Sequence, residues 1–110
     1  MTPASQLSAV MKTLADPTRR AVFERIAGES EIAATALVKG SKVSQPAVSQ
    51  HLRALRDAGL VVERREGRHI YYRPAPMGLA PLNDWLSHYE AFWRERLDNL
   101  EKLLEEGGDE

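Results

Sequence analysis

The sequence predicts a mainly α-helical domain that carries one small β-hairpin, and three observations indicate this fold class. Apolar residues recur at helical spacing in short segments before residue 58, residues 60–73 alternate as β-strands do, and helical spacing returns in a long stripe after residue 79. The chain has 110 residues, a length that suits one domain with one core. We therefore expect a single domain over residues 1–110.

The composition limits the class of protein. There are no cysteines, so disulfides and thiolate metal sites are both excluded, which fits a reducing cytoplasm. The sequence contains no run of about 18 apolar residues, so no transmembrane helix is predicted. The N-terminal segment lacks the basic region followed by an apolar region that a secretory signal has. We expect a small cytoplasmic protein that has no membrane partner.

The charge is divided unevenly along the chain. Residues 1–73 hold 12 Lys and Arg against 7 Asp and Glu, a balance of +5, whereas residues 74–110 hold 3 against 9, a balance of −6. Such a division is typical of a protein in which one part meets phosphates and another part has a different task. An acidic C-terminal helix that only keeps the protein in solution is the alternative interpretation, and the motifs that follow favour the first one.

Two helices are expected in the N-terminal segment. A first amphipathic helix over residues 5–15 is predicted by four apolar residues at helical spacing, which are Leu7, Val10, Met11 and Leu14. The second helix follows at once, because Asp16 is a good N-cap acceptor and Pro17 suits the first helical position. Its inward residues recur up to Ile26, and we expect it to end at Gly28.

A third and a fourth helix are expected on either side of a short turn. The third covers residues 31–39, with Ile32, Ala36 and Leu37 directed inward, and Gly40 ends it. The fourth begins at Ser44, whose hydroxyl can cap the free N–H groups of the first turn, and Gly59 supplies its left-handed C-cap. Within it a buried stripe is predicted by the spacing of Val48, Leu52 and Leu55.

The polar face of the fourth helix carries the functional signal. Two helices joined by a turn of three or four residues form a helix-turn-helix, in which the start of the second helix enters the DNA major groove. Gln45, Ser49, Gln50 and Arg53 lie opposite the buried stripe, and these residue types suit base edges and phosphates. An ordinary exposed helix would mix Glu with Lys, and residues 44–56 contain no Glu.

A basic β-hairpin follows the fourth helix directly. Leu60 and Val62 alternate on one strand and Ile70 and Tyr72 on the other, with Glu66 and Gly67 as the expected turn. The tip carries four cationic or potentially cationic residues, which are Arg64, Arg65, Arg68 and His69. A basic loop is often only a solvated turn, but beside a helix-turn-helix it is placed to contact the sugar-phosphate backbone.

The final stripe predicts a long helix that pairs with a second chain. Apolar residues recur at steps of three and four residues, at Leu82, Leu86, Tyr89, Trp93, Leu97, Leu100 and Leu104. A helix over residues 80–106 would be about 40 Å long, more than one small domain can cover. We expect an isologous homodimer formed by the first and last helices, and hence an inverted-repeat operator whose half-sites lie about 10 bp apart.

Three stretches together resemble the ArsR-type (ArsR/SmtB-like) winged helix-turn-helix repressors. They are "LADPTRRAVFERI", "VSQPAVSQHLRALRDAGLV" and "REGRHIYYR", which occur in this order within residues 7–73. The family often has Gly before the Val-Ser pair, where this chain has Lys42. The resemblance implies a DNA-binding homodimeric repressor with a helix-turn-helix over residues 31–58, a wing over 60–73, and dimerisation helices over 1–15 and 79–106.

Two candidate interfaces follow, one from the resemblance and the basic wing and the other from the apolar stripes of the first and last helices. The resemblance implies DNA contacts by Ser44, Gln45, Ser49, Gln50, His51, Arg53, Arg65 and Arg68. Lys42, which departs from the family pattern, and Ala47 and His69, which lie beside these residues, complete the candidate DNA-binding set. The candidate dimer residues are Leu7, Val10, Met11, Leu14, Leu86, Tyr89, Phe92, Trp93, Leu97, Leu100 and Leu104. Double-stranded DNA and a second copy of the chain are thus the expected partners.

Other functions find less support in the residues. Metal-responsive repression through the last helix is one alternative, but Asp84 and His88 are too few ligands for a tight zinc site, so no metal and no cofactor is expected. The sequence contains no nucleophile–base arrangement and no Gly-rich phosphate loop, so we expect no enzyme activity. A winged helix that binds another protein is the second alternative, although such an interface would favour aromatic residues on the fourth helix. Any small-molecule inducer is unknown.

Overall fold

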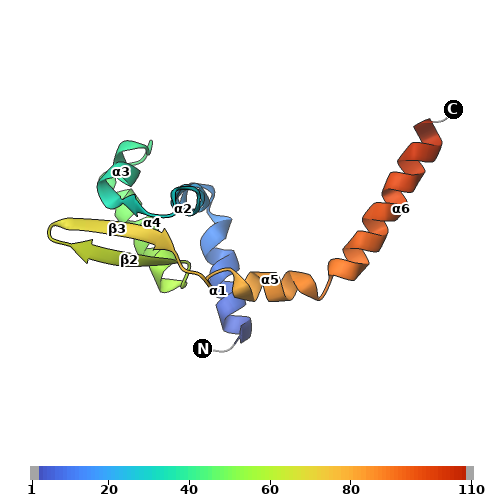
Figure 1. The fold of residues 1–110 in the computed structure, drawn as a ribbon, viewed down its shortest axis with the longest axis horizontal. Helices are drawn as coiled ribbons and strands as arrows, with labels where there is room; N and C mark the ends of the chain where they lie inside the picture. The colour runs from blue at the N-terminus through green and yellow to red at the C-terminus, as the bar shows by residue number, and fades with distance from the viewer. Residues whose placement is uncertain (1–2, 109–110) are drawn as a thin grey trace.

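The computed structural model describes residues 3–108, which form a helical domain with a β-hairpin at one end and a projecting helix at the other (Figure 1). The elements in chain order are α1 (Pro3–Ala15), α2 (Pro17–Glu29), β1 (Ile32–Ala33), α3 (Ala34–Lys39), α4 (Gln45–Asp57), β2 (Val61–Glu66), β3 (His69–Pro74), α5 (Ala80–Ser87) and α6 (Glu90–Gly108). The predicted fold class, mainly helical with a small hairpin, is confirmed. No helix in the described range is both long and apolar enough to cross a membrane.

One hydrophobic core lies among the helices and the base of the hairpin. Its members are Val10, Val22, Phe23, Ile26, Ile32, Leu37, Val48, Leu52, Leu55, Leu60, Val61 and Tyr72. Among them, Ile26, Leu55 and Leu60 are completely buried, and burial of each such side chain contributes about 2 kcal/mol to folding. The core therefore fixes α4 against α2 and β2, which determines the direction of the opposite face of α4.

Two predicted helix starts are confirmed. The Asp16 side chain accepts a hydrogen bond from the backbone N–H of Arg19 at 3.0 Å, and this bond lowers the pKa of the Asp16 carboxyl. The Ser44 hydroxyl accepts from the backbone N–H of Ala47 at 3.3 Å. The expected end of the second helix was wrong by one residue, because α2 continues to Glu29 and Ser30 adopts the positive φ.

The start of the predicted third helix was wrong. Ile32 and Ala33 form a short strand that pairs with Tyr72 and Tyr71 of β3, so the sheet has the order β1-β3-β2. Helix α3 begins only at Ala34. Pairing with β3 satisfies backbone groups that a helix would otherwise use internally, and β-branched Ile32 suits a strand. A pattern confined to residues 31–39 carries no signal for this distant partner.

The hairpin differs from the prediction in its turn and in its face. Glu66 pairs with His69, so the loop consists of Gly67 and Arg68. Gly67 has a φ of +60° and Arg68 does not have a positive φ, as in a type II′ hairpin turn. Val61, not Val62, is the buried valine of β2, because the strand begins after Leu60 and the alternation starts at Val61.

The predicted continuous helix over residues 80–106 was also wrong. It is divided into α5 and α6, and the chain bends between them (Figure 1). At the bend the N–H of His88 donates to Trp85 O at 3.3 Å and the N–H of Tyr89 to Leu86 O at 3.0 Å, which are tight three-residue bonds. Helix α5 packs against α1, whereas α6 extends away from the domain.

Two glycines provide a matched test of this packing. A methyl group at Gly78 would lie 2.9 Å from Gly59 O and 3.0 Å from Leu60 Cα, which are backbone atoms that cannot move freely. We expect Gly78→Ala to lower the free energy of unfolding by about 1–3 kcal/mol. Gly28→Ala should raise it by up to about 1 kcal/mol, because Gly28 is helical and a Cβ there meets nothing within 4 Å. Urea unfolding measures both changes, and equal effects would contradict the packing described here.

Candidate nucleic-acid interface

Helices α3 and α4 are joined by a tight turn over residues 40–44. The N–H of Gly40 donates to Ala36 O at 3.1 Å, and the N–H of Ser41 donates to Val38 O at 3.1 Å. Arg25 of α2 adds a third donor, since its guanidinium lies 3.4 Å from Leu37 O. These bonds satisfy the last carbonyls of α3 and hold the two helices in a helix-turn-helix arrangement.

The exposed face of α4 consists of small and uncharged polar side chains followed by one arginine. Gln45, Ser49, Gln50 and Arg53 are all exposed, while Val48 and Leu52 on the opposite side are buried. No acidic residue occurs in α4 before Asp57 at its last position. This face offers hydrogen-bond donors and acceptors without a charge that would repel phosphate.

The candidate residues around the start of α4 have mixed roles. Lys42 is exposed, whereas the Ser44 hydroxyl is engaged in capping α4 and Ala47 is half-buried. His51 is half-buried, and its Nδ1 accepts a hydrogen bond from Arg19 Nε at 3.3 Å. Arg19 therefore joins this edge of the site from α2, a placement that sequence reasoning missed. The "PTRR" segment contained the cation but gave no sign of its distant partner.

The cationic tip residues of the wing are exposed, and two of them, Arg68 and His69, pair with no acidic side chain among the described residues. The Arg65 side chain is 71% exposed, with Nε 3.7 Å from Glu63 Oε1. Arg68 and His69 are exposed at the loop. These three side chains are those that the sequence singled out for backbone contact, and all of them are accessible in the monomer.

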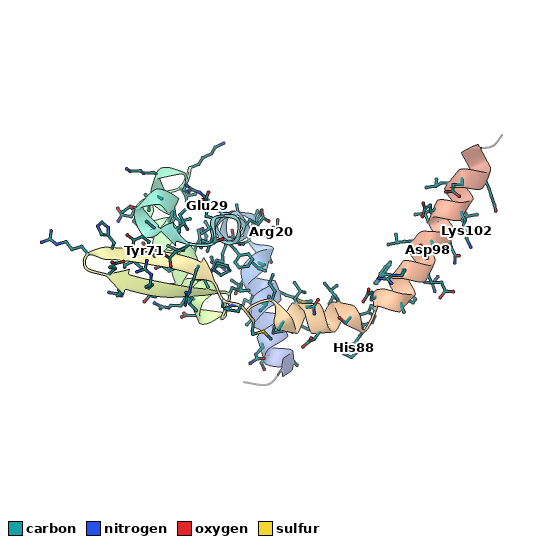
Figure 2. All side chains as sticks on the ribbon, viewed as in Figure 1. Arg20, Glu29, Tyr71, His88, Asp98 and Lys102 are labelled. Atoms are coloured by element: carbon teal, nitrogen blue, oxygen red, sulfur yellow. The ribbon has the colours of Figure 1, made fainter. Side chains whose placement is uncertain are left out.

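Arg64 has a different role from the one that its place in the basic cluster indicated. Its guanidinium lies 2.8 Å from Glu31 Oε1, 2.7 Å from Glu66 Oε2 and 4.6 Å from the centre of the Tyr71 ring. These contacts raise the pKa of Arg64 and lower that of Glu31. Arg64 thus ties the hairpin to the segment before β1, on the face of the sheet that carries Tyr71, a residue labelled in Figure 2.

Glu63 organises the inner face of the hairpin, which is turned toward α4. Tyr72 donates its hydroxyl to Glu63 Oε2 at 3.4 Å, and both Arg56 of α4 and Arg65 lie 3.7 Å from the same carboxylate. Burial raises the pKa of Tyr72, and the neighbouring Glu63 charge raises it further. One carboxylate therefore connects the wing with the end of α4.

The candidate dimer residues divide into two groups. In α1, Val10 is 1% exposed and belongs to the core, Leu14 packs against the core, and Met11 alone is clearly exposed, with Leu7 half-buried. All the candidates of the C-terminal segment are between 45% and 68% exposed, and they are Leu86, Tyr89, Phe92, Trp93, Leu97, Leu100 and Leu104. Free apolar surface is thus concentrated along α5 and α6.

Asp84 and His88 lie on α5 and at its end, and they belong to no larger group of possible ligands. Within residues 3–108, no three His, Cys, Asp or Glu side chains are gathered closely enough to hold a metal ion. His51 and His69 are in the helix-turn-helix and the wing, on elements separate from α5. The donor set around Asp84 does not fit a zinc site of four ligands.

Comparison with known proteins gives consistent matches. A family model described as a helix-turn-helix domain matches residues 14–64. The HTH-type transcriptional regulator Rv2034 of Mycobacterium tuberculosis is 40% identical over 99 residues, 90% of this chain and 89% of the relative. A transcriptional repressor SmtB homolog of Synechocystis is 34% identical over 90% of this chain and 67% of its own. The homodimeric winged helix-turn-helix DNA-binding domain Mb0332 of Mycobacterium bovis, a possible ArsR-family regulator, superposes with a TM-score of 0.64 at 31% identity, over 80% of this chain and 81% of that one.

Proposed function

The chain belongs to the ArsR/SmtB family of winged helix-turn-helix transcriptional regulators, and we propose that within this family it is a homodimeric repressor of an inverted-repeat operator. The proposal rests on the exposed polar face of α4, which contains no acidic residue before Asp57. The direction of this face is fixed by the burial of Val48, Leu52 and Leu55 on the opposite side of the helix. In this account α4 lies in the major groove, where Gln45, Ser49 and Gln50 reach base edges.

Phosphate contacts surround this central reading face. Lys42 lies in the turn before α4, His51 lies midway along the helix, and Arg53 lies one turn beyond Gln50 on the exposed side. From the other side, Arg65 and Arg68 of the wing reach the backbone of the same half-site. Phosphate contacts of this kind fix position and supply affinity, while base contacts supply sequence preference.

A second copy of the chain is proposed to cover the apolar side of α5 and α6. Trp93, Leu97 and Leu104 expose between 56% and 68% of their surface, and exposed apolar side chains that recur along one helix are typical of a protein–protein contact. A two-fold axis through this contact would place two α4 helices about one duplex turn apart. A role in binding and not in catalysis, and a cytoplasmic location, belong to the same proposal.

Selection of bound duplexes from a random pool tests the proposed function directly. We expect the recovered sequences to share two inverted half-sites with centres about 10 bp apart. Parallel selections with and without a chelator would reveal any dependence on metal, and we expect the same motif in both. Recovery of an asymmetric motif, or of no motif, would reject the proposal.

The wing makes a separate quantitative prediction. We expect Arg65→Ala combined with Arg68→Ala to weaken binding to all duplexes and to reduce the slope of log K against log salt by about 1.8, since each lost phosphate contact removes about 0.9. Arg64→Ala is the matched control, because Arg64 is paired with Glu31 and Glu66. Fluorescence anisotropy at several salt concentrations measures the slopes, and an unchanged slope in the double variant would place the wing away from DNA.

A further inference from the structure

A groove lies between α3, α4 and the inner face of the hairpin, beside the proposed base-reading residues. Its volume is about 500 Å³, which falls within the range of small-molecule sites. We call it the α3–α4–wing groove, and its lining residues are Ala34, Thr35, Val38, Lys39, Gln45, Val48, Ser49, Leu52, Arg53, Arg56, Glu63, Arg65, Ile70 and Tyr72. The floor is therefore apolar, with aliphatic side chains and one tyrosine ring.

The charged residues of this groove are unbalanced. Four are cations, Lys39, Arg53, Arg56 and Arg65, and a single one is an anion, Glu63. The Glu63 carboxylate is shared between Arg56 and Arg65 at 3.7 Å each, and it also accepts from Tyr72. Neither Lys39 nor Arg53 pairs with an acidic side chain among the described residues. Arg56 also lies 3.5 Å from Asp57 Oδ1. An apolar floor beside two cations without an acidic partner matches a ligand that has an apolar body and one anionic end.

We propose that the α3–α4–wing groove binds a hydrophobic monocarboxylate, with its apolar body on the floor and its carboxylate between the arginines, and that this ligand competes with DNA. The competition between this ligand and DNA rests on the proposed function. Gln45, Ser49, Arg53 and Arg65 both line the groove and belong to the proposed DNA-binding face. The ligand carboxylate would bind the arginines, and its ring system would fill the space beside Ser49. These side chains could then no longer contact the duplex.

The carboxylate is recognised through arginine geometry and not through charge alone. Guanidinium groups form two parallel hydrogen bonds to a carboxylate, and such bonds strengthen when apolar surface excludes water beside them. Arg56 is half-exposed, at 44% of its side chain, and lies at the end of the apolar floor. It can therefore contact the ligand carboxylate while keeping Glu63 on its other side.

Calorimetry with 2-naphthoate, in the absence of DNA, tests the site on the full chain. We expect 2-naphthoate to bind at one site per chain, and naphthalene-2-carboxamide, which has the same shape and no charge, to bind at least tenfold more weakly. Binding of 2-naphthoate should also weaken with salt, as an interaction between charges does. Equal affinity for the acid and the amide, or no binding of the acid, would overturn the proposal.

Two pairs of variants locate the bound acid. Thr35→Trp places a bulky ring in the groove from an exposed position, and Ala27→Trp adds the same ring on the exposed side of α2. Arg56→Gln removes a groove cation, and Arg73→Gln removes an exposed cation from the outer face of the hairpin. We expect Thr35→Trp and Arg56→Gln each to lower naphthoate affinity at least fivefold, with no change in either control.

Thermal melts followed by circular dichroism establish that the four variants are folded. If a groove variant does not fold, 2-naphthoate-induced chemical shift changes in the unaltered protein provide the same information. Shifts centred on Thr35, Ile70 and Tyr72 support the assignment, and shifts centred on α5 or α6 overturn it.

Competition with the selected operator distinguishes the ligand site from the proposed function. We expect 2-naphthoate to displace a labelled duplex at concentrations near its own dissociation constant, and the amide to leave the complex intact. Binding of naphthoate in the groove without displacement would overturn the competition. If the protein binds no duplex, the proposed function and the competition fail together, whereas the groove assignment is decided by the calorimetry.

Discussion

Leu97→Glu should convert the protein to monomers that bind the operator at least a hundredfold more weakly than the unaltered protein does. Leu97 is 60% exposed in the middle of α6, on the same side as Trp93, Leu100 and Leu104. If this stripe lies at the two-fold contact, a carboxylate at residue 97 would be buried in apolar surroundings in both subunits, at a cost of several kcal/mol. Sedimentation velocity measures the assembly, and anisotropy measures the affinity.

The large effect on DNA follows from the linkage between the two half-sites. When one subunit is bound, the second faces its half-site at an effective concentration of the order of millimolar, which a free monomer lacks. Ala91→Glu is the matched control, because residue 91 lies about 160° around α6 from Trp93 at 100° per residue. This control should remain dimeric and bind normally. A Leu97→Glu protein that still dimerises, or that binds tightly as a monomer, would contradict the proposed contact.

Replacement of Ser49 and Gln50 by alanine should remove sequence preference while leaving the fold intact. Both side chains are exposed on α4, so their loss opens no cavity. A paired hydrogen bond from Gln50 to a base contributes about 1–3 kcal/mol of discrimination, so we expect a loss of tenfold to a hundredfold on the selected operator and a small loss on random duplex. Competition anisotropy with both duplexes measures the ratio.

A phosphate-contact variant provides the comparison for this result. Lys42→Ala should weaken binding to operator and to random duplex by the same factor, because a phosphate is present at every sequence. Equal losses on the two duplexes in the Ser49→Ala and Gln50→Ala proteins would show that this part of α4 does not read bases. The three variants together separate recognition from general affinity.

Local signals in the sequence were sufficient for most of the helical framework. Capping by Asp16 and Ser44 depends on atoms within three residues, and the buried stripe of α4 follows from spacing alone, so both predictions are confirmed. The presence of the two hairpin strands was also predicted, since strand alternation extends over residues 60–73, although the buried face of β2 was not. Properties that depend on a few neighbours along the chain can be read without knowing the rest of the fold.

Features that depend on distant partners were missed. The strand at Ile32 exists only because Tyr72 of β3 lies beside it, forty residues further along the chain. The break between α5 and α6 was missed as well, because the apolar spacing continues across it from Leu86 to Tyr89 and shows no interruption.

The same limit applies to the candidate site. The four cationic residues of the wing tip look equivalent in the sequence, yet Glu31, which lies thirty-three residues from Arg64, engages this one alone. The pairing of Arg19 with His51 also joins residues thirty-two positions apart. The exposed face of α4 could be predicted because its orientation is set by the buried side of its own helix. Only the folded structure shows which of the cationic side chains have no acidic partner and can bind phosphate.

The contacts of Arg64 with Glu31, Glu66 and Tyr71 affect the entropy change when the protein binds DNA. Isolated two-stranded ribbons fluctuate, and a fluctuating ribbon loses conformational entropy when a duplex immobilises it. Here Glu31, Glu66 and the Tyr71 ring already restrict Arg64 in the unbound protein. If the wing contacts DNA as proposed, the ordering cost has already been met during folding, and more of the electrostatic attraction remains to lengthen the residence time on DNA.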